Sequence, residues 1–410
     1  MLLFFSAIGY SAFGAVFPDL GKGKFSSLEQ RSYTKIEDFA TASFIDETAQ
    51  GLCEQLFADS VPFREPLVFF NAGIQRCSIK IGAKAFGIRA YPTYFGSGFV
   101  EVPRKHCIVQ MAMRVPTNTL RDSWISTLNE AAQSHPKIRF SFTALLDIRQ
   151  SAANPTHDLI SGELLDSAWA QENLVDKLDP SIDATVDEIS STGKFVESGF
   201  STDLHWNQKR ALRTYNRIGA KLGWEHYGWK GAIRVAKAWY GTNARTGRDL
   251  RYSSELWDLP YLFDNLEYYK YREGEIDAFP STEPGRRPLV LAKEKRRMRT
   301  ADPYNVYQRY HGAFNGLIVN KTSNNKKTLL FICDSNSHCL KRYVAQNYRY
   351  TYVMMPGNAT YDGNLEDYIM EYDPDDIVVL MHSQKYQQIA EYSPKFIGLE
   401  APAGVTEEEL

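Results

Sequence analysis

The sequence lacks an excess of charge of either sign. Its 47 Lys and Arg side chains stand against 49 Asp and Glu, so the formal net charge is −2 over 410 residues. No long-range field therefore draws the chain to nucleic acid or anionic lipid, and a polyanionic partner would need a local basic patch. A hydrophobic content of 43% is that of a globular protein. It excludes disordered and collagen-like chains and leaves room for about two or three domains.

Cysteine is scarce and follows no pattern. The five cysteines form an odd set without a CxxC motif: Cys53, Cys77, Cys107, Cys333 and Cys339. The sequence therefore predicts neither a disulfide framework nor a zinc site. The pairs His106-Cys107 and His338-Cys339 do not change this, because adjacent side chains seldom converge on one ion. We expect no metal and no cofactor.

Long hydrophobic runs are lacking after the first residues. Residues 1–17 carry no charge, but they fall short of the roughly 20 residues that span a bilayer. This start predicts a signal peptide or a short membrane anchor, and Ala12 and Gly14 resemble a signal-peptidase site. A buried core helix is the alternative. We therefore expect residues 18–410 to be extracytoplasmic, either periplasmic or at the cell surface.

The remaining sequence predicts a helical connector followed by one main domain. Residues 18–80 form the connector, and residues 81–400 form an α/β domain that ends before an acidic tail at 401–410. A basic insertion near 280–300 includes the run Lys293 to Arg299. The simplest interpretation of this run is a solvated loop, and the alternative is a surface for an anionic sugar polymer.

Alternating strands and helices give the clearest pattern in the chain. Apolar runs typical of buried strands lie at 138–148, 328–334, 349–355 and 376–381, and helical segments lie at 338–348 and 364–372. This alternation predicts βαβ units and a parallel sheet. Reactive groups on such sheets lie where strands end and helices begin.

Two short motifs fall at such positions. Asp334-Ser335 follows the apolar strand TLLFIC, and Asp203-Leu204-His205-Trp206 directly precedes a helix that starts near Asn207. A serine hydroxyl becomes a good nucleophile when a histidine takes its proton and a carboxylate orients that histidine. The simpler reading is that Asp334 and Asp203 cap helices. Together, the motifs suggest a split Ser-His-Asp triad.

With these motifs the sequence resembles a known family. The segments FADSVPFREPLVFFNAGIQ at 57–75, TDLHWNQKRALRTYNRIG at 202–219, FDNLEYYKY at 263–271 and LLFICDSNSH at 329–338 follow the order seen in bacterial DHHW proteins. That family belongs with the alginate O-acetyltransferase proteins of the SGNH-hydrolase-like superfamily. The resemblance covers scattered blocks between residues 45 and 382, and only the D-x-H-W and D-S motifs are specific.

The resemblance implies a three-layer α/β/α domain with a mostly parallel sheet. Its nucleophile falls on Ser335, its base on His205 and its orienting acid on Asp203. Trp206 falls on the motif's packing residue and is also a candidate substrate contact.

Three positions depart from the family pattern. Leu204 replaces the first His of the family's name, and Cys333 replaces the usual Gly before Asp-Ser. After the strand at 349–355, the Asp and Arg expected from relatives are missing. Asn358 and Ser383 are candidate substitutes for substrate contacts, and each also reads as a simple turn residue.

The resemblance implies transfer of acetyl groups to a bacterial exopolysaccharide or cell-wall glycan through an acyl-serine intermediate. A membrane-bound O-acyltransferase is the expected partner that supplies the acyl group. A carbohydrate esterase with the same triad is one alternative. A catalytically silent glycan-binding or assembly protein is the other, favoured by the aromatic content of 13%, because flat rings suit sugar faces.

Overall fold

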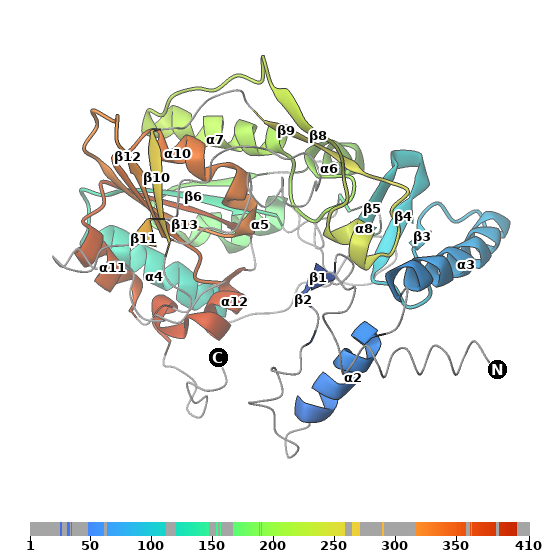
Figure 1. Cartoon of the computed structure of the whole chain (residues 1–410). Coiled ribbons are helices and arrows are strands. Elements are labelled where there is room, and N and C mark those ends of the chain that lie inside the picture. The colour runs from blue at the N-terminus through green and yellow to red at the C-terminus, as the bar shows by residue number, and fades with distance from the viewer. Residues whose placement is uncertain are drawn as a thin grey trace. The chain divides into compact units, whose positions relative to one another are not determined.

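The computed structural model (Figure 1) describes residues 25–26, 31–32, 34, 48–60, 64–111, 120–146, 153–154, 156, 167–187, 189, 191–258, 265–270, 289–290, 316–357, 361, 363–382 and 385–399. The chain divides into two compact units. Unit 1 comprises residues 1–110 and 240–253, and unit 2 comprises residues 111–239 and 254–410. The predicted leader at 1–17, the basic run at 293–299 and the tail at 401–410 lie outside the described residues, and the predicted domain boundaries stay predictions.

Unit 1 combines helices with small antiparallel sheets. Its elements are β1 (Phe25–Ser26), β2 (Arg31–Ser32), α2 (Thr48–Ser60), α3 (Arg64–Ala85), β3 (Tyr91–Pro92), β4 (Phe99–Val102), η2 (Pro103–Lys105), β5 (Cys107–Gln110) and α8 (Thr242–Thr246). Strand β1 pairs with β2, and β4 pairs with both β3 and β5.

Unit 2 is built on an eight-stranded sheet with the order β11-β10-β12-β14-β13-β15-β6-β7. Its strands are β6 (Arg139–Leu145), β7 (Asp183–Asp187), β10 (Leu266–Lys270), β11 (Leu289–Val290), β12 (Gly316–Asn320), β13 (Thr328–Cys333), β14 (Tyr350–Met354) and β15 (Asp376–His382). The strands from β14 to β7 pair in parallel, whereas β12, β10 and β11 extend the sheet antiparallel. The predicted α/β class with a mostly parallel sheet is confirmed.

Helices lie on both faces of this sheet (Figure 1). One apolar cluster joins the sheet to α4 (Leu120–Ser134), α5 (Ser167–Asn173), α11 (Leu365–Tyr372), α12 (Lys385–Tyr392) and η6 (Pro394–Ile397). The other joins it to α7 (Gln208–Leu222), η5 (Ser335–Cys339) and α10 (Lys341–Ala345). Cover on both faces explains why β13 is a continuous apolar run, since Leu329 to Ile332 are each 0% exposed.

Further elements of unit 2 are η4 (Val175–Lys177), α6 (Thr192–Ser198) and a two-stranded antiparallel sheet of β8 (Ile233–Trp239) and β9 (Ser254–Asp258). In the described part of the chain, no helix is both long enough and apolar enough to cross a bilayer.

Local signals place the ends of α7. The Asn207 side chain accepts the Arg210 N–H at the start, and Gly223 ends the helix in the left-handed conformation with φ 76°. The predicted helix at 338–348 differs, because the chain first forms the 3₁₀ turn η5 and only then the short helix α10. The Asp334 carboxylate accepts the Asn336 N–H at 2.8 Å, which favours a tight turn in place of a regular helical start.

Lys341 in α10 is buried, and burial lowers its pKa to about 8. Below this pH the amine is charged in both the folded and the unfolded state, so burial of the charge lowers the stability of the folded state by its full amount. As the pH rises from about 8 towards the unfolded pKa near 10.4, the cost falls and the folded state gains stability. We therefore expect Lys341→Met to raise the free energy of unfolding by about 1–3 kcal/mol at neutral pH.

The advantage of the Met variant should shrink as the pH rises. Urea unfolding of parent and variant at neutral pH and near pH 10 measures both values. A difference that does not change with pH would contradict the interpretation of Lys341 as a buried cation.

Candidate active site

Asp203 and His205 lie in a tight loop just before α7. The loop is closed by antiparallel backbone pairing, in which the Phe200 N–H donates to the His205 carbonyl at 3.2 Å and the Asn207 N–H donates to the Ser198 carbonyl at 2.9 Å. The Asp203 side chain is 2% exposed and the His205 side chain 16%. The carboxylate is thus sealed from water, and one edge of the imidazole stays accessible.

Ser335 lies at the carboxyl end of β13, as the first residue of η5. The preceding residue, Asp334, is 1% exposed and has an extended backbone with φ −123°. Among the described residues, the non-glycine positions with positive φ are His106, Arg248 and Asp373, so the turn at Cys333 needs no glycine. The departure at Cys333 is therefore compatible with the backbone of this turn.

The structure brings Ser335, His205 and Asp203 together across a sequence separation of 130 residues. His205 Nε2 lies 2.9 Å from Ser335 Oγ, and His205 Nδ1 lies 2.6 Å from Asp203 Oδ1. The same carboxylate oxygen accepts the His205 backbone N–H at 3.0 Å. Because Nδ1 must donate to the carboxylate, Nε2 is free to accept the Ser335 hydroxyl proton. We call this arrangement the Ser-His-Asp relay; its catalytic role stays a prediction.

Trp206 ties the histidine loop to the serine turn. Its indole Nε1–H donates to the Asn336 carbonyl at 2.6 Å, and the side chain is 3% exposed within the apolar cluster around α7. The Arg210 guanidinium lies over the ring, 5.4 Å from its centroid. This position favours the packing role of Trp206 over direct contact with a substrate.

Asp334 holds the serine turn to the end of β15. Its carboxylate accepts hydrogen bonds from the Asn336 N–H at 2.8 Å, the Asn336 Nδ2 at 3.1 Å and the His382 backbone N–H at 2.7 Å. Three N–H donors thus satisfy this buried carboxylate. The Asp334 side chain thereby holds the turn at Asn336 and the end of β15 at His382 next to Ser335.

His382 is a second histidine beside the relay. Its Nε2 lies 2.5 Å from Asn336 Nδ2. Since the Asp334 carboxylate can only accept, the amide NH₂ of Asn336 must face it, and the same NH₂ then donates to His382. His382 Nε2 therefore accepts from this amide, and His382 Nδ1 lies 3.9 Å from Asp334 Oδ2. The sequence analysis did not identify His382 or Asn336 as site residues. The signal that could have found them is that β15 pairs in parallel with β13, so that both strands end at the same edge of the sheet.

Burial separates Ser335 from the neighbouring thiols. Cys333 is 0% exposed and Cys339 7%, and burial raises the pKa of each thiol to about 12. Both stay protonated near neutral pH, which makes them poor nucleophiles.

Among the described residues, no three His, Cys, Asp or Glu side chains are grouped so that they could hold a metal ion.

The other two predicted substrate contacts, Asn358 and Ser383, lie outside the described residues.

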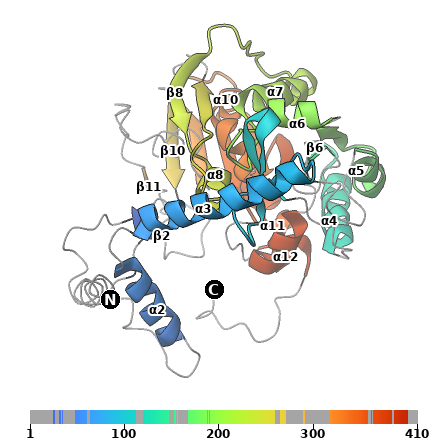
Figure 2. The same cartoon turned by 90° about the vertical axis from the view of Figure 1, so that its right-hand side faces the viewer.

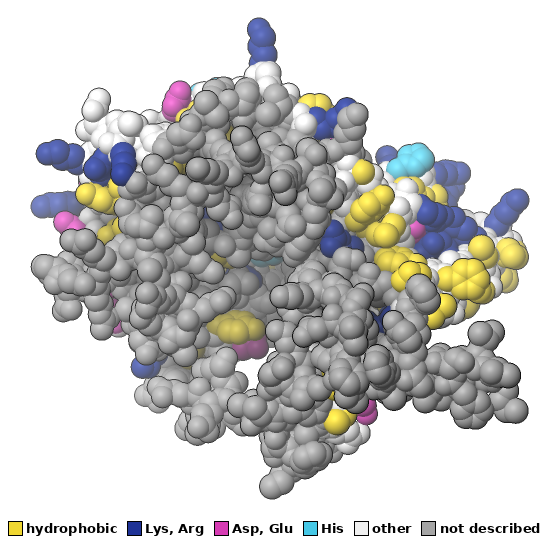
Figure 3. All heavy atoms as spheres, viewed as in Figure 1, with side chains coloured by type: hydrophobic (Ala, Val, Ile, Leu, Met, Phe, Trp, Pro, Cys, Tyr) yellow, Lys and Arg dark blue, Asp and Glu magenta, His cyan; other side chains and the backbone are white. Residues whose placement is uncertain are grey.

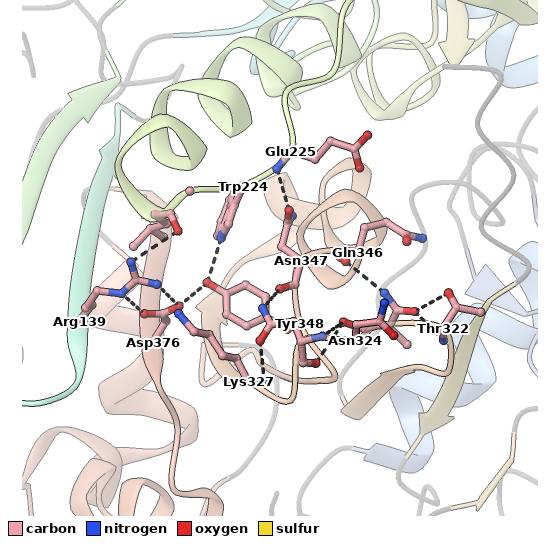
Figure 4. Close-up of a pocket in the computed structure, with 15 residues that line it drawn as sticks. Arg139, Trp224, Glu225, Thr322, Asn324, Lys327, Gln346, Asn347, Tyr348 and Asp376 are labelled. Atoms are coloured by element: carbon pink, nitrogen blue, oxygen red, sulfur yellow. Dashed lines mark hydrogen bonds and ion pairs between the residues drawn. The ribbon is translucent and has the colours of Figure 1, made fainter.

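A polar cavity of about 580 Å³ lies at the opposite edge of the sheet (Figure 4). Arg139 and Asp376 in its wall begin β6 and β15, whereas Ser335 follows the end of β13. Its inner groups bind one another: Asp376 accepts from Arg139 at 2.5 and 2.7 Å and from the Tyr348 hydroxyl at 2.7 Å. Trp224 Nε1 donates to the Tyr348 oxygen at 2.8 Å. We place the candidate active site at Ser335, because the cavity holds no nucleophile paired with a base.

Comparison with known proteins shows relatives of the fold only. No protein-family model and no curated protein sequence matches the chain. PatB1 of Bacillus cereus superposes with a TM-score of 0.50 and 13% identity, over 68% of this chain and 95% of PatB1. The same protein with a sulfonyl adduct gives 0.52 and 13%, over 70% and 96% of the two chains.

A DHHW family protein from Eubacterium siraeum gives a TM-score of 0.52 with 11% identity, over 74% of this chain and 96% of that protein. The O-acetyltransferase domain of Pseudomonas putida AlgJ reaches 0.34, which is too low to carry an argument. The structural neighbours thus include the DHHW family that the motifs resemble. At these identities the likeness shows a shared fold.

The Asp334 network should control how reactive Ser335 is. Asp334→Asn keeps the shape of the side chain, but it places an NH₂ group against the N–H donors that the carboxylate now accepts. We expect the variant to react at least about tenfold more slowly with phenylmethanesulfonyl fluoride and to unfold about 1–3 kcal/mol more easily.

Intact mass against time measures the labelling rate of the folded variant. Asp373→Asn, an exposed change at the end of α11, is the control. Equal labelling rates for Asp334→Asn and the parent would show that the network does not position Ser335.

Proposed function

We propose that the protein is an O-acetyltransferase of the SGNH-hydrolase-like type that acetylates an extracytoplasmic glycan. The observation that carries the proposal is the relay of Asp203, His205 and Ser335, with heavy-atom distances of 2.6 and 2.9 Å. The fold shared with a DHHW family protein supports it. A three-layer α/β/α arrangement of unit 2 belongs to the same proposal.

The first step forms an acetyl-serine. His205 Nε2 takes the Ser335 hydroxyl proton while Ser335 Oγ bonds to the carbonyl carbon of the acetyl donor. The bond from that carbon to the leaving group breaks, and the leaving group takes the proton from His205. Asp203 stabilises the imidazolium that exists between these events and keeps its Nε2 directed at Ser335.

The second step reverses the roles with a sugar hydroxyl as acceptor. His205 removes the hydroxyl proton, and the sugar oxygen bonds to the acetyl carbon. The bond from that carbon to Ser335 Oγ then breaks, and Ser335 Oγ takes the proton back from His205. If water replaces the sugar, the same relay is an esterase. The outcome depends on which acceptor occupies the site.

The setting and the partners are part of the proposal. The uncharged start at residues 1–17 supports an extracytoplasmic location, with a signal peptide or an anchor. A membrane-bound O-acyltransferase would deliver the acetyl group. The exposed edge of His205, at 16%, leaves the relay accessible to a large acceptor.

Incubation with p-nitrophenyl acetate tests the nucleophile. We expect intact mass to show one added acetyl group on the parent and none on Ser335→Ala, because the Ser335 hydroxyl is the one hydrogen-bonded to the His205 imidazole in the relay. Ser126→Ala, at an exposed position on α4, is the matched control and should be acetylated like the parent. Acetylation that survives Ser335→Ala would contradict the assignment.

Single and double variants test the relay as a unit. We expect His205→Ala and Ser335→Ala each to lower the rate of p-nitrophenol release by about 10³-fold or more, and the double variant to be hardly worse. Losses that multiply in the double variant would indicate separate structural damage. Adding a neutral oligosaccharide and measuring acetylated sugar against free acetate then separates transferase from esterase.

A further inference from the structure

Helix α3 of unit 1 exposes an apolar stripe. Leu67, Phe70, Ile74, Cys77 and Ile81 recur at intervals of three and four residues, which places them on one face of the helix. Phe70 is 69% exposed and Ile81 74%, and Cys77 is an exposed free thiol. We call these residues the α3 stripe; α3 is the long blue helix in Figure 2.

The apolar surface continues beyond the helix. Phe86 and Ile88, 82% and 50% exposed, flank Gly87, which ends α3 in the left-handed conformation with φ 67°. Phe95, 63% exposed, lies in the β3–β4 turn, and its N–H donates to the Gln75 side chain of α3 at 3.0 Å. Seven of the twelve exposed large hydrophobic side chains described lie between residues 67 and 95. A concentration of this kind marks an interaction surface.

The same surface is basic. Residues 64–110 contain seven Lys and Arg and two acidic residues, Glu65 and Glu101, a net charge of +5 in a chain whose total is −2. Three of the seven are ion-paired: Arg64 with Asp59, Arg76 with Asp249 and Lys80 with Glu101. Glu101 is buried and bound by Arg251. Lys84, Arg89, Arg104 and Lys105 are exposed. Figure 3 shows hydrophobic and basic side chains side by side over α3 and the neighbouring strands.

We propose that this face of unit 1 docks on a lipid bilayer that contains anionic headgroups. The α3 stripe would lie in the plane of the interface, with its apolar side chains at the boundary between headgroups and acyl chains. The exposed Lys and Arg side chains would face the lipid phosphates, which attract each basic residue near the surface. A second copy of the chain fits less well, because pairing two such faces would bring two basic rims together.

The sequence offers an independent reason for a membrane partner. Residues 1–17 are uncharged and mostly apolar, and they precede α3 by fewer than 50 residues. A chain whose start is held at a membrane would keep the α3 stripe close to that surface. The proposal does not depend on the chemistry proposed for Ser335.

Cys77 makes the stripe directly observable. In a Cys53→Ser background it is the exposed thiol, since Cys107, Cys333 and Cys339 are buried. A nitrobenzoxadiazole fluorophore on Cys77 of the full chain reports transfer from water into lipid. With vesicles of phosphatidylglycerol and phosphatidylethanolamine we expect a severalfold gain in emission with a blue shift, and little change with phosphatidylcholine vesicles.

Variants of the α3 stripe and of the exposed basic residues separate the apolar contribution to binding from the electrostatic one. Phe70→Ser should lower the vesicle partition constant by roughly tenfold, because one large apolar side chain no longer enters the lipid. Met370→Ser on α11 is the matched control, since Met370 and Phe70 are both 69% exposed. Lys84→Gln with Arg89→Gln should also weaken binding, and added salt should remove that difference.

Three results would overturn the proposal. One is an unchanged emission from the Cys77 probe in anionic vesicles, which would show that the stripe stays in water even if residues 1–17 bind. Another is an equal response in neutral vesicles. The last is a blue shift that grows with protein concentration without vesicles, which would show that a second copy covers the stripe.

Discussion

The buried carboxylate of Asp334 is the interaction on which the candidate active site depends. It accepts two N–H groups of Asn336 and the backbone N–H of His382, so it connects the end of β13 with the end of β15. Removing a charge acceptor from such a position leaves buried donors without partners, which costs more than the hydrogen bonds themselves contribute. Ser335 is held in place through this connection. Trp206 then attaches the histidine loop to the same turn through the Asn336 carbonyl.

Much of the fold can be predicted from the sequence, because its strands are buried on both faces. The run TLLFIC is apolar throughout since both sides of β13 face covering helices, and the same holds for β15. Local caps such as Asn207 and Gly223 also mark helix ends directly in the sequence. The candidate nucleophile follows from this reading, because Ser335 comes where a buried strand stops.

What the sequence cannot supply is the set of partners that meet only after folding. The contact of Asn336 with His382 joins residues 46 positions apart, and no local pattern announces it. The start of the predicted helix at 338 is replaced by a 3₁₀ turn, because a side-chain hydrogen bond to Asp334 competes with the helical pattern. On α3 the apolar residues occur on two faces, and periodicity alone does not tell which face is covered. The high exposures of Phe70 and Ile81 in the folded protein identify their face as the uncovered one.

The wide separation of the relay residues along the chain has a consequence for measuring stability. His205 reaches Ser335 only when the loop before α7 and the turn after β13 have both docked on the same apolar cluster. An unfolded chain has no mechanism to keep these two side chains together, so its serine hydroxyl has ordinary reactivity. Under the proposed function, the rate at which a serine-directed reagent modifies the protein is therefore proportional to the fraction of native molecules. Followed across a denaturant series, it would give the free energy of unfolding from chemistry alone, without any optical signal.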